Sequence, residues 1–162
     1  MRTVDATPAD WPEIWPILRK VAAAEDTFCW PPDITEQQAR AVWMLPSPNR
    51  TLVLRNEEDL VVGTATLHAN LGGPAAHVAN ASFAVDPRYR GRSLGRRLAE
   101  DTLARARAEG YRAMQFNAVV EANTAAVALW KSLGFRVLAT IPDAFLHPTF
   151  GYVGLHVMHR AL

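Results

Sequence analysis

The sequence has 162 residues, of which 49% are hydrophobic and 20% charged, and its formal net charge is +1. These values are typical of one globular domain and exclude a disordered or fibrous chain, and so small a net charge gives no indication of a nucleic-acid partner. Cys29 is the single cysteine, so no intrachain disulfide can form and a reducing compartment is favoured. Because we find neither a signal peptide nor an apolar run of about 20 residues, we expect a cytoplasmic protein with no membrane partner.

The hydrophobic pattern and the turn residues predict seven strands and four helices. In chain order these are a strand over 2–6, helices over 8–24 and 35–43, strands over 51–55, 60–68 and 77–85, a helix over 92–109, a strand over 112–119, a helix over 123–133, and strands over 135–141 and 152–159. Residues 142–151 are expected to form a loop. No repeat or linker interrupts this order, so we expect a single domain over 1–162. The order predicts an α/β (α+β) fold, a mixed sheet with helices on both faces.

Several helix ends carry specific signals. Thr7 followed by Pro8 is a favourable helix start, and Thr35 with Gln38 forms a capping-box pattern. Gly110 ends the helix over 92–109, because glycine adopts a left-handed cap without strain. One broad side of that helix is apolar and is expected to be buried; it comprises Leu94, Leu98, Ala99, Thr102, Leu103 and Ala106.

The most informative stretch lies where a strand ends at Val85 and a helix begins shortly after Gly91. The first N–H groups of a helix have no internal partners, and the helix dipole adds positive potential there, so such an end binds phosphate. Five arginines are concentrated around it: Arg88, Arg90, Arg92, Arg96 and Arg97. This pattern favours a phosphate-binding loop, although a basic surface turn with a glycine would have the same local composition. A Rossmann loop is not expected, because it would lie in the first strand–helix unit.

Two segments resemble the signature of the GNAT superfamily of N-acetyltransferases. Residues 90–95 (RGRSLG) are similar to the family pattern Gln/Arg-x-x-Gly-x-Gly/Ala, except that Ser93 replaces the middle glycine. Residues 123–135 (NTAAVALWKSLGF) look like Asn-x-x-Ala-x-x-Leu-Tyr-x-x-x-Gly-Phe, with Trp130 in place of the tyrosine. The resemblance implies a mostly antiparallel seven-stranded sheet with about four helices, in which the fourth and fifth strands splay apart.

By this resemblance, the gap between the splayed strands holds acetyl-CoA. The residues implied in its binding are Val85, Arg90, Gly91, Arg92, Ser93, Leu94, Gly95, Arg96 and Asn123. Asn123 is an equally good N-cap for the helix after it, and both roles can hold at once. The family tyrosine protonates the leaving thiolate; Trp130 can only donate a hydrogen bond, so it either serves as such a donor or packs in the core.

Polar residues on the strands beside this gap suggest an acceptor site. Asn80 and Asn117 lie on neighbouring predicted strands, where asparagine is disfavoured, and either orient a substrate or satisfy local backbone groups. Together with Phe83, they also look like substrate positions of fungal acetyltransferases of proline analogues. An attacking amine must lose a proton, and the candidate bases are His77, Glu121, His147 and Glu25. Water relayed by backbone carbonyls and Asn117 is the competing account.

Two aromatic loops, residues 25–32 and 142–148, are expected either to enclose a small acceptor or to form a homodimer contact. Cys29 lies in the first loop and is expected to be a buried structural residue, not a nucleophile. We therefore expect acetyl transfer from acetyl-CoA to a small primary or secondary amine, an amino acid or analogue being favoured, without a metal. A protein N-terminal or lysine acetyltransferase and a catalytically weak acyl-CoA-binding module are the alternatives.

Overall fold

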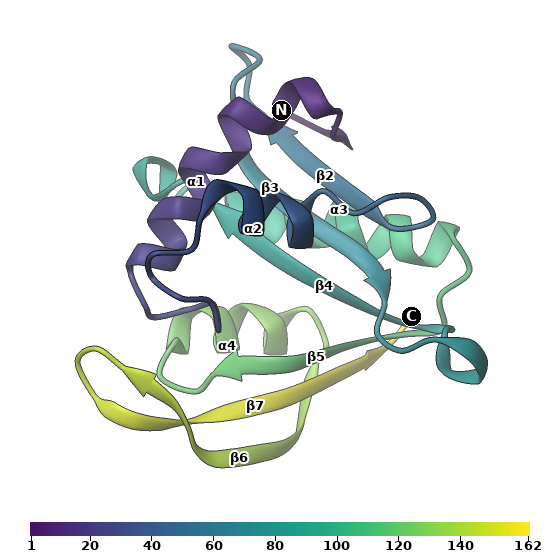
Figure 1. The fold of residues 1–162 in the computed structure, drawn as a ribbon. Coiled ribbons are helices and arrows are strands. Elements are labelled where there is room, and N and C mark those ends of the chain that lie inside the picture. Colours follow the sequence, from purple (N-terminus) through teal and green to yellow (C-terminus); the bar gives the residue numbers. More distant parts are fainter.

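Seven strands form one sheet that four α-helices flank (Figure 1). The computed structural model describes residues 1–162. The strands are β1 (Arg2–Asp5), β2 (Arg50–Arg55), β3 (Val61–Ala69), β4 (Val78–Val85), β5 (Ala113–Val120), β6 (Arg136–His147) and β7 (Gly151–Ala161), and the α-helices are α1 (Trp11–Ala23), α2 (Glu36–Trp43), α3 (Leu94–Ala108) and α4 (Thr124–Ser132). In space the strands follow the order β1-β2-β3-β4-β5-β7-β6, and every neighbouring pair is antiparallel except β4 and β5. The sheet is therefore the mixed, mostly antiparallel one that the resemblance implied.

The helices cover the two faces of the sheet, α1 and α2 on one side and α3 on the other (Figure 1). Alternation along β2 decides the packing: Val53 packs with α1 and α2, whereas its neighbours Leu52 and Leu54 pack with α3. Trp130 of α4 belongs to the same buried cluster as Leu103 of α3. The helices α3 and α4 thus lie against one continuous core.

The backbone pairing between β4 and β5 is very short. Only Val78 with Ala113 and Ala79 with Met114 are paired, although each strand has eight residues. In β5 a register shift against β7 follows Phe116, which bends the strand. The expected splay of the fourth and fifth strands is confirmed.

The predicted helices are all present, and their caps explain where they begin and end. Thr35 and Gln38 form the predicted capping box of α2. The apolar side of α3 is buried as expected, and Gly110 follows it in the left-handed region with φ 86°. However, α3 begins at Leu94, two residues later than predicted, because Ser93 adopts the left-handed region with φ 57°. No helix is both long enough and apolar enough to cross a bilayer.

The prediction of a loop over residues 142–151 is wrong for most of its length. β6 continues to His147, and Leu146 pairs with Tyr152 of β7. A register shift between Ile141 and Phe145 accommodates Pro142, which cannot donate to the strand ladder. A proline therefore marks an irregularity inside this edge strand and not its end.

Candidate functional site

A cavity of about 520 Å³ opens where β4 and β5 separate. Its lining includes six of the residues that the sequence selected: Asn80, Phe83, Val85, Asn117, Asn123 and Trp130. Beyond Ala79, the edge of β4 that faces β5 has no strand partner, so its backbone groups are available to a ligand. The splay thus creates both the cavity and an unpaired strand edge along it.

Two groups of aromatic side chains surround this cavity. From the sheet and α4, the Trp130 ring lies 5.0 Å from Phe83 and 4.7 Å from Phe116, centroid to centroid. From the segment between α1 and α2, Phe28 and Trp30 also line the cavity and lie 4.9 Å apart. The predicted role of residues 25–32 in forming the cavity wall is supported for Thr27–Trp30, whereas no residue of 142–148 lines it.

Trp130 is only 8% exposed, yet its indole N–H stays accessible. The N–H donates to no acceptor in the chain, and the chain has no fully buried polar side-chain atom without a partner. Because Trp130 lines the cavity, the N–H is open to a ligand there. Packing and hydrogen-bond donation, the two roles weighed from the sequence, are therefore compatible.

A network of amide side chains connects the two splayed strands. Asn70 Oδ1 accepts from Asn80 Nδ2 at 3.0 Å and from Asn117 Nδ2 at 2.7 Å. Gln115 Nε2 donates to Asn117 Oδ1 at 2.9 Å. Asn80 and Asn117 were predicted to lie together, but Asn70 was missed because its position after β3 reads as an ordinary turn residue. A third asparagine near the predicted gap could have indicated Asn70, but only with knowledge of which strands pair.

No charged side chain and no histidine lines the cavity. His77, predicted as a catalytic base, lies exposed just before β4, outside the cavity, where its carbonyl accepts from Arg112 N. This placement gives no support to its catalytic role. Two other candidates have local roles instead, since Glu121 accepts from Gly154 N at 3.1 Å and His147 accepts from Thr149 N. Of the accounts weighed from the sequence, relay through water and Asn117 is the one that fits this lining.

Cys29 is exposed at the cavity, so the prediction of a buried structural cysteine is wrong. The aromatic residues on either side form part of the cavity wall and leave the thiol at its surface. Partial desolvation raises the pKa of the Cys29 thiol above its ordinary value. The thiol is thus protonated at neutral pH, which disfavours a role as nucleophile.

Six consecutive backbone N–H groups precede the first hydrogen-bonded turn of α3. The N–H groups of residues 91–96 donate to no carbonyl of the chain, and the first bond of the turn runs from Arg97 N to Ser93 O at 3.1 Å. Gly91 has φ 76°, and a Cβ there would have no atom within 4 Å, so the conformation and not crowding requires glycine. A series of unpaired N–H groups at the start of a helix is suited to binding an anion.

The five arginines around this loop have different roles. Arg88 pairs with buried Asp86 at 2.6 Å, and Arg97 pairs with Asp101 at 2.9 Å. Arg96 donates to Ser132 of α4 at 2.7 Å, which links the first turn of α3 to the helix that carries Trp130. Arg90 and Arg92 have no carboxylate partner, although Arg92 lies over the Tyr89 ring at 5.4 Å. These two guanidinium groups are therefore free to bind an anion.

Asp86 anchors the start of the loop. Its carboxylate accepts from the Arg88 backbone N–H at 3.0 Å and from the Arg88 guanidinium, and Lys20 lies 3.8 Å away. Burial alone would raise the pKa of Asp86, but the hydrogen bonds from Arg88 outweigh it and hold the pKa below its ordinary value. Asp86 is therefore ionised in the folded protein at neutral pH.

Asp86→Asn is expected to lower the free energy of unfolding by about 1–3 kcal/mol at neutral pH, because it weakens buried charge-assisted hydrogen bonds. The folded-state pKa lies below the unfolded value near 3.8, so the carboxylate stabilises the fold above that value and loses this effect as pH falls through the folded pKa. Urea unfolding between about pH 7 and pH 3 should therefore show a flatter acid dependence for the variant. Identical pH dependences would contradict this role of Asp86.

Comparison with known proteins gives consistent matches. Residues 11–135 match the sequence profile of the acetyltransferase (GNAT) family. The structure of a GCN5-related N-acetyltransferase from Kribbella flavida is 53% identical, with a TM-score of 0.96 over 99% of this chain and 97% of that chain. N-acetyltransferase aca1 of Schizosaccharomyces pombe is 29% identical over 113 residues, which are 69% of this chain and 54% of that protein. The chain thus spans about half the length of this curated relative.

A further structural neighbour contains the expected cosubstrate. A phosphinothricin acetyltransferase from Sinorhizobium meliloti, solved in complex with acetyl-CoA, is 22% identical with a TM-score of 0.87, over 99% of this chain and 88% of that chain. At this identity the likeness shows the fold alone. This neighbour, which has the same fold as this chain, was thus solved with acetyl-CoA bound.

Proposed function

Because this chain belongs to the GNAT family of N-acetyltransferases, we propose that it transfers an acetyl group from acetyl-CoA to the primary or secondary amine of a small acceptor, with an amino acid or analogue favoured. One observation carries the proposal: an anion site and an uncharged aromatic cavity meet along α4. Ser132 and Leu129 of α4 lie against Arg96 and Gly95 in the first turn of α3. Ala126 and Trp130 of the same helix line the cavity. A long cosubstrate with a phosphate end and a reactive end fits this arrangement.

The loop of residues 90–96 would hold the pyrophosphate through its free N–H groups, with Arg90 and Arg92 on the outer phosphates. The pantetheine arm would then lie along the unpaired edge of β4, past Val85 and toward Asn80. Asn123 caps α4 by accepting from Ala126 N at 3.2 Å, and it lines the cavity at the same time. This path brings the thioester to the aromatic cavity.

The reaction proposed is direct attack of the amine nitrogen on the thioester carbonyl. The C–N bond forms, the C–S bond breaks, and the nitrogen loses a proton while the thiolate leaves. Trp130 can stabilise the thiolate through its accessible N–H, but it cannot supply the proton near neutral pH. With no titratable base in the cavity lining, the amine proton passes to water, which Asn117 and backbone carbonyls can order.

The cavity lining supports a small acceptor over a protein surface. The Phe28–Trp30 segment and Phe83 bound the space beside Asn80 and Asn117, and about 520 Å³ suits a small molecule. Protein N-terminal acetylation remains the second candidate, because a chain end also presents a primary amine. Mass spectrometry of products from amino acids, polyamines and short peptides separates these proposals: acetylated peptides without acetylated small amines would favour the second.

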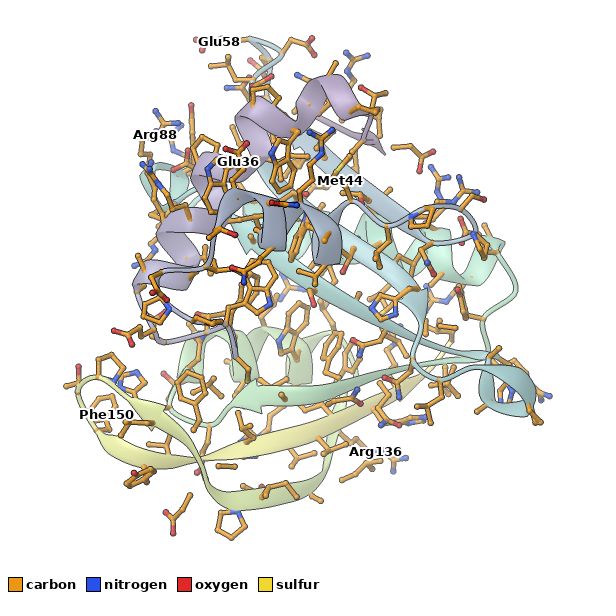
Figure 2. The ribbon with its side chains drawn as sticks, in the orientation of Figure 1. Glu36, Met44, Glu58, Arg88, Arg136 and Phe150 are labelled. Atoms are coloured by element: carbon orange, nitrogen blue, oxygen red, sulfur yellow. The ribbon has the colours of Figure 1, made fainter.

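We further propose that the protein forms a homodimer through the hairpin of β6 and β7. Five of the nine exposed large hydrophobic side chains lie there: Leu138, Ile141, Leu146, Phe150 and Tyr152. Phe150 lies at the free end of the hairpin, away from the rest of the molecule (Figure 2). Between Val137 and Met158 the only charged side chain is Asp143. Depletion of charge with enrichment of aromatics is the composition of an interface core.

The size of this surface favours a second copy as its partner. At roughly 100–150 Å² of exposed area for each side chain, the five offer about 600 Å² per copy, or ~1,200 Å² in a symmetric pair. This is the lower end of stable, specific interfaces, and homodimer interfaces are the more apolar class.

At micromolar protein concentration we expect the wild type to be a dimer and the double variant Leu146→Lys/Tyr152→Lys to be a monomer. The two exposed side chains form one cross-strand pair, so the variant places two charges at the same point of the proposed interface. Light scattering coupled to gel filtration measures the mass. Leu71→Lys is the matched control, since Leu71 is equally exposed at 64% but lies far along the chain from the hairpin, and should stay dimeric. A monomeric wild type, or a double variant that remains dimeric, would contradict the proposal.

A further inference from the structure

The amide network lies where the backbone pairing of β4 and β5 ends. The last paired residues are Ala79 and Met114. The next residue on each strand, Asn80 and Gln115, carries a side-chain amide. From this point the two strands are connected through Asn70 and no longer through backbone hydrogen bonds. The network therefore marks the apex of the splay.

Asn70 itself is held in place by the hairpin between β3 and β4. Its backbone N–H donates to Val78 O at 2.8 Å. Its side-chain Oδ1 accepts from both Asn80 and Asn117, whereas its Nδ2 has no partner in the chain. Asn70 thus acts only as a double acceptor in this network.

We propose that Asn70 is a positioning residue that fixes Asn80 and Asn117 for the acceptor amine; this inference rests on the proposed function. With its Nδ2 directed to Asn70, Asn80 keeps an Oδ1 that accepts from no group in the chain. No fully buried side-chain polar atom is unpaired, so this oxygen is not fully buried, and it belongs to a residue that lines the cavity. It is an acceptor for an N–H of the incoming amine.

The polarity of this site also restricts the acceptor. A hydrogen-bond acceptor in a lining without charged groups favours an uncharged amine and offers no partner that would neutralise a second cationic group. We therefore expect monoamines to be better acceptors than polyamines. Asn117 Oδ1 accepts from Gln115, whereas Asn80 Oδ1 accepts from no group in the chain, so Asn80 is the amide with both lone pairs open to this contact.

The test compares Asn70→Ala with Asn70→Asp. An aspartate at this position can accept both N–H groups, whereas alanine can accept neither. Asn70→Ala is expected to raise the acceptor KM at least tenfold, because two hydrogen bonds of about 1 kcal/mol each no longer orient the amides. The kcat, the acetyl-CoA Kd and the melting temperature should change little. Asn70→Asp should restore most of the acceptor affinity, and Leu71→Ala, in the same turn, is the control.

Three outcomes would overturn the inference. They are an unchanged acceptor KM in Asn70→Ala, equal impairment in Asn70→Ala and Asn70→Asp, and a loss of acetyl-CoA affinity or melting temperature that matches the loss of acceptor affinity. A wild-type protein that acetylates no amine would instead overturn the proposed function. The side-chain amide resonances of Asn80 and Asn117 give a readout independent of activity: they should shift in Asn70→Ala, and unchanged resonances would exclude the network.

Discussion

Replacing both Arg90 and Arg92 with alanine is expected to weaken acetyl-CoA binding by at least about 100-fold. Neither guanidinium has a carboxylate partner in the chain, and both residues belong to the segment that carries the free N–H groups of residues 91–96. A charge-assisted hydrogen bond to phosphate contributes about 1.5–3 kcal/mol, so the loss of two such contacts accounts for a change of this size. Isothermal titration with acetyl-CoA at fixed ionic strength measures it.

Arg97→Ala is the matched control for this pair. Arg97 lies on the first turn of α3, but its guanidinium is engaged by Asp101 at 2.9 Å. We expect its removal to leave the acetyl-CoA Kd within about twofold, since exposed pairs of this kind contribute little. An Arg90→Ala/Arg92→Ala protein with unchanged affinity would mean that the phosphate site lies elsewhere.

Trp130→Phe is expected to lower kcat about fivefold while leaving the fold intact. Phenylalanine keeps the ring contacts with Phe83 and Phe116 but lacks the N–H that is open to the cavity. The loss of a hydrogen bond worth about 1 kcal/mol to the leaving thiolate gives a change of this size. Stopped-flow measurement of acetyl transfer at saturating substrates separates this step from product release.

Trp130→Ala separates packing from chemistry at the same position. Trp130 is 8% exposed, and truncation of a buried tryptophan costs about 3–5 kcal/mol. This variant should therefore lose thermal stability, whereas Trp130→Phe should not lose more than a small part of it. Unchanged turnover in Trp130→Phe would leave Trp130 as a packing residue only.

The parts of the fold that were predictable have local signals. The capping box at Thr35 is a short-range pattern, and so is the apolar side of α3, because both depend on residues within a few turns of each other. The glycine turn that precedes α3 was predictable for the same reason. The positive φ of Ser93, which delays the start of α3, was not, because serine rarely adopts that region.

The features that the sequence did not reveal depend on which strands pair. Asn70 and Asn117 are 47 positions apart, and only the sheet order brings their side chains within hydrogen-bond distance. The continuation of β6 past Pro142 depends likewise on β7, which supplies a partner beyond the irregularity. His77 was selected because histidine often acts as a base, but the splay opens at the other end of β4.

Free-thiol release from acetyl-CoA is the most direct test of the proposed acetyl transfer. The purified protein would be mixed with acetyl-CoA and a panel of amino acids, polyamines, amine antibiotics and short peptides. We predict thiol release that depends on a small monoamine, with N-acetylated product formed in equal amount. Measurable acetyl-CoA binding without thiol release for any amine would contradict the account and favour an acyl-CoA-binding module.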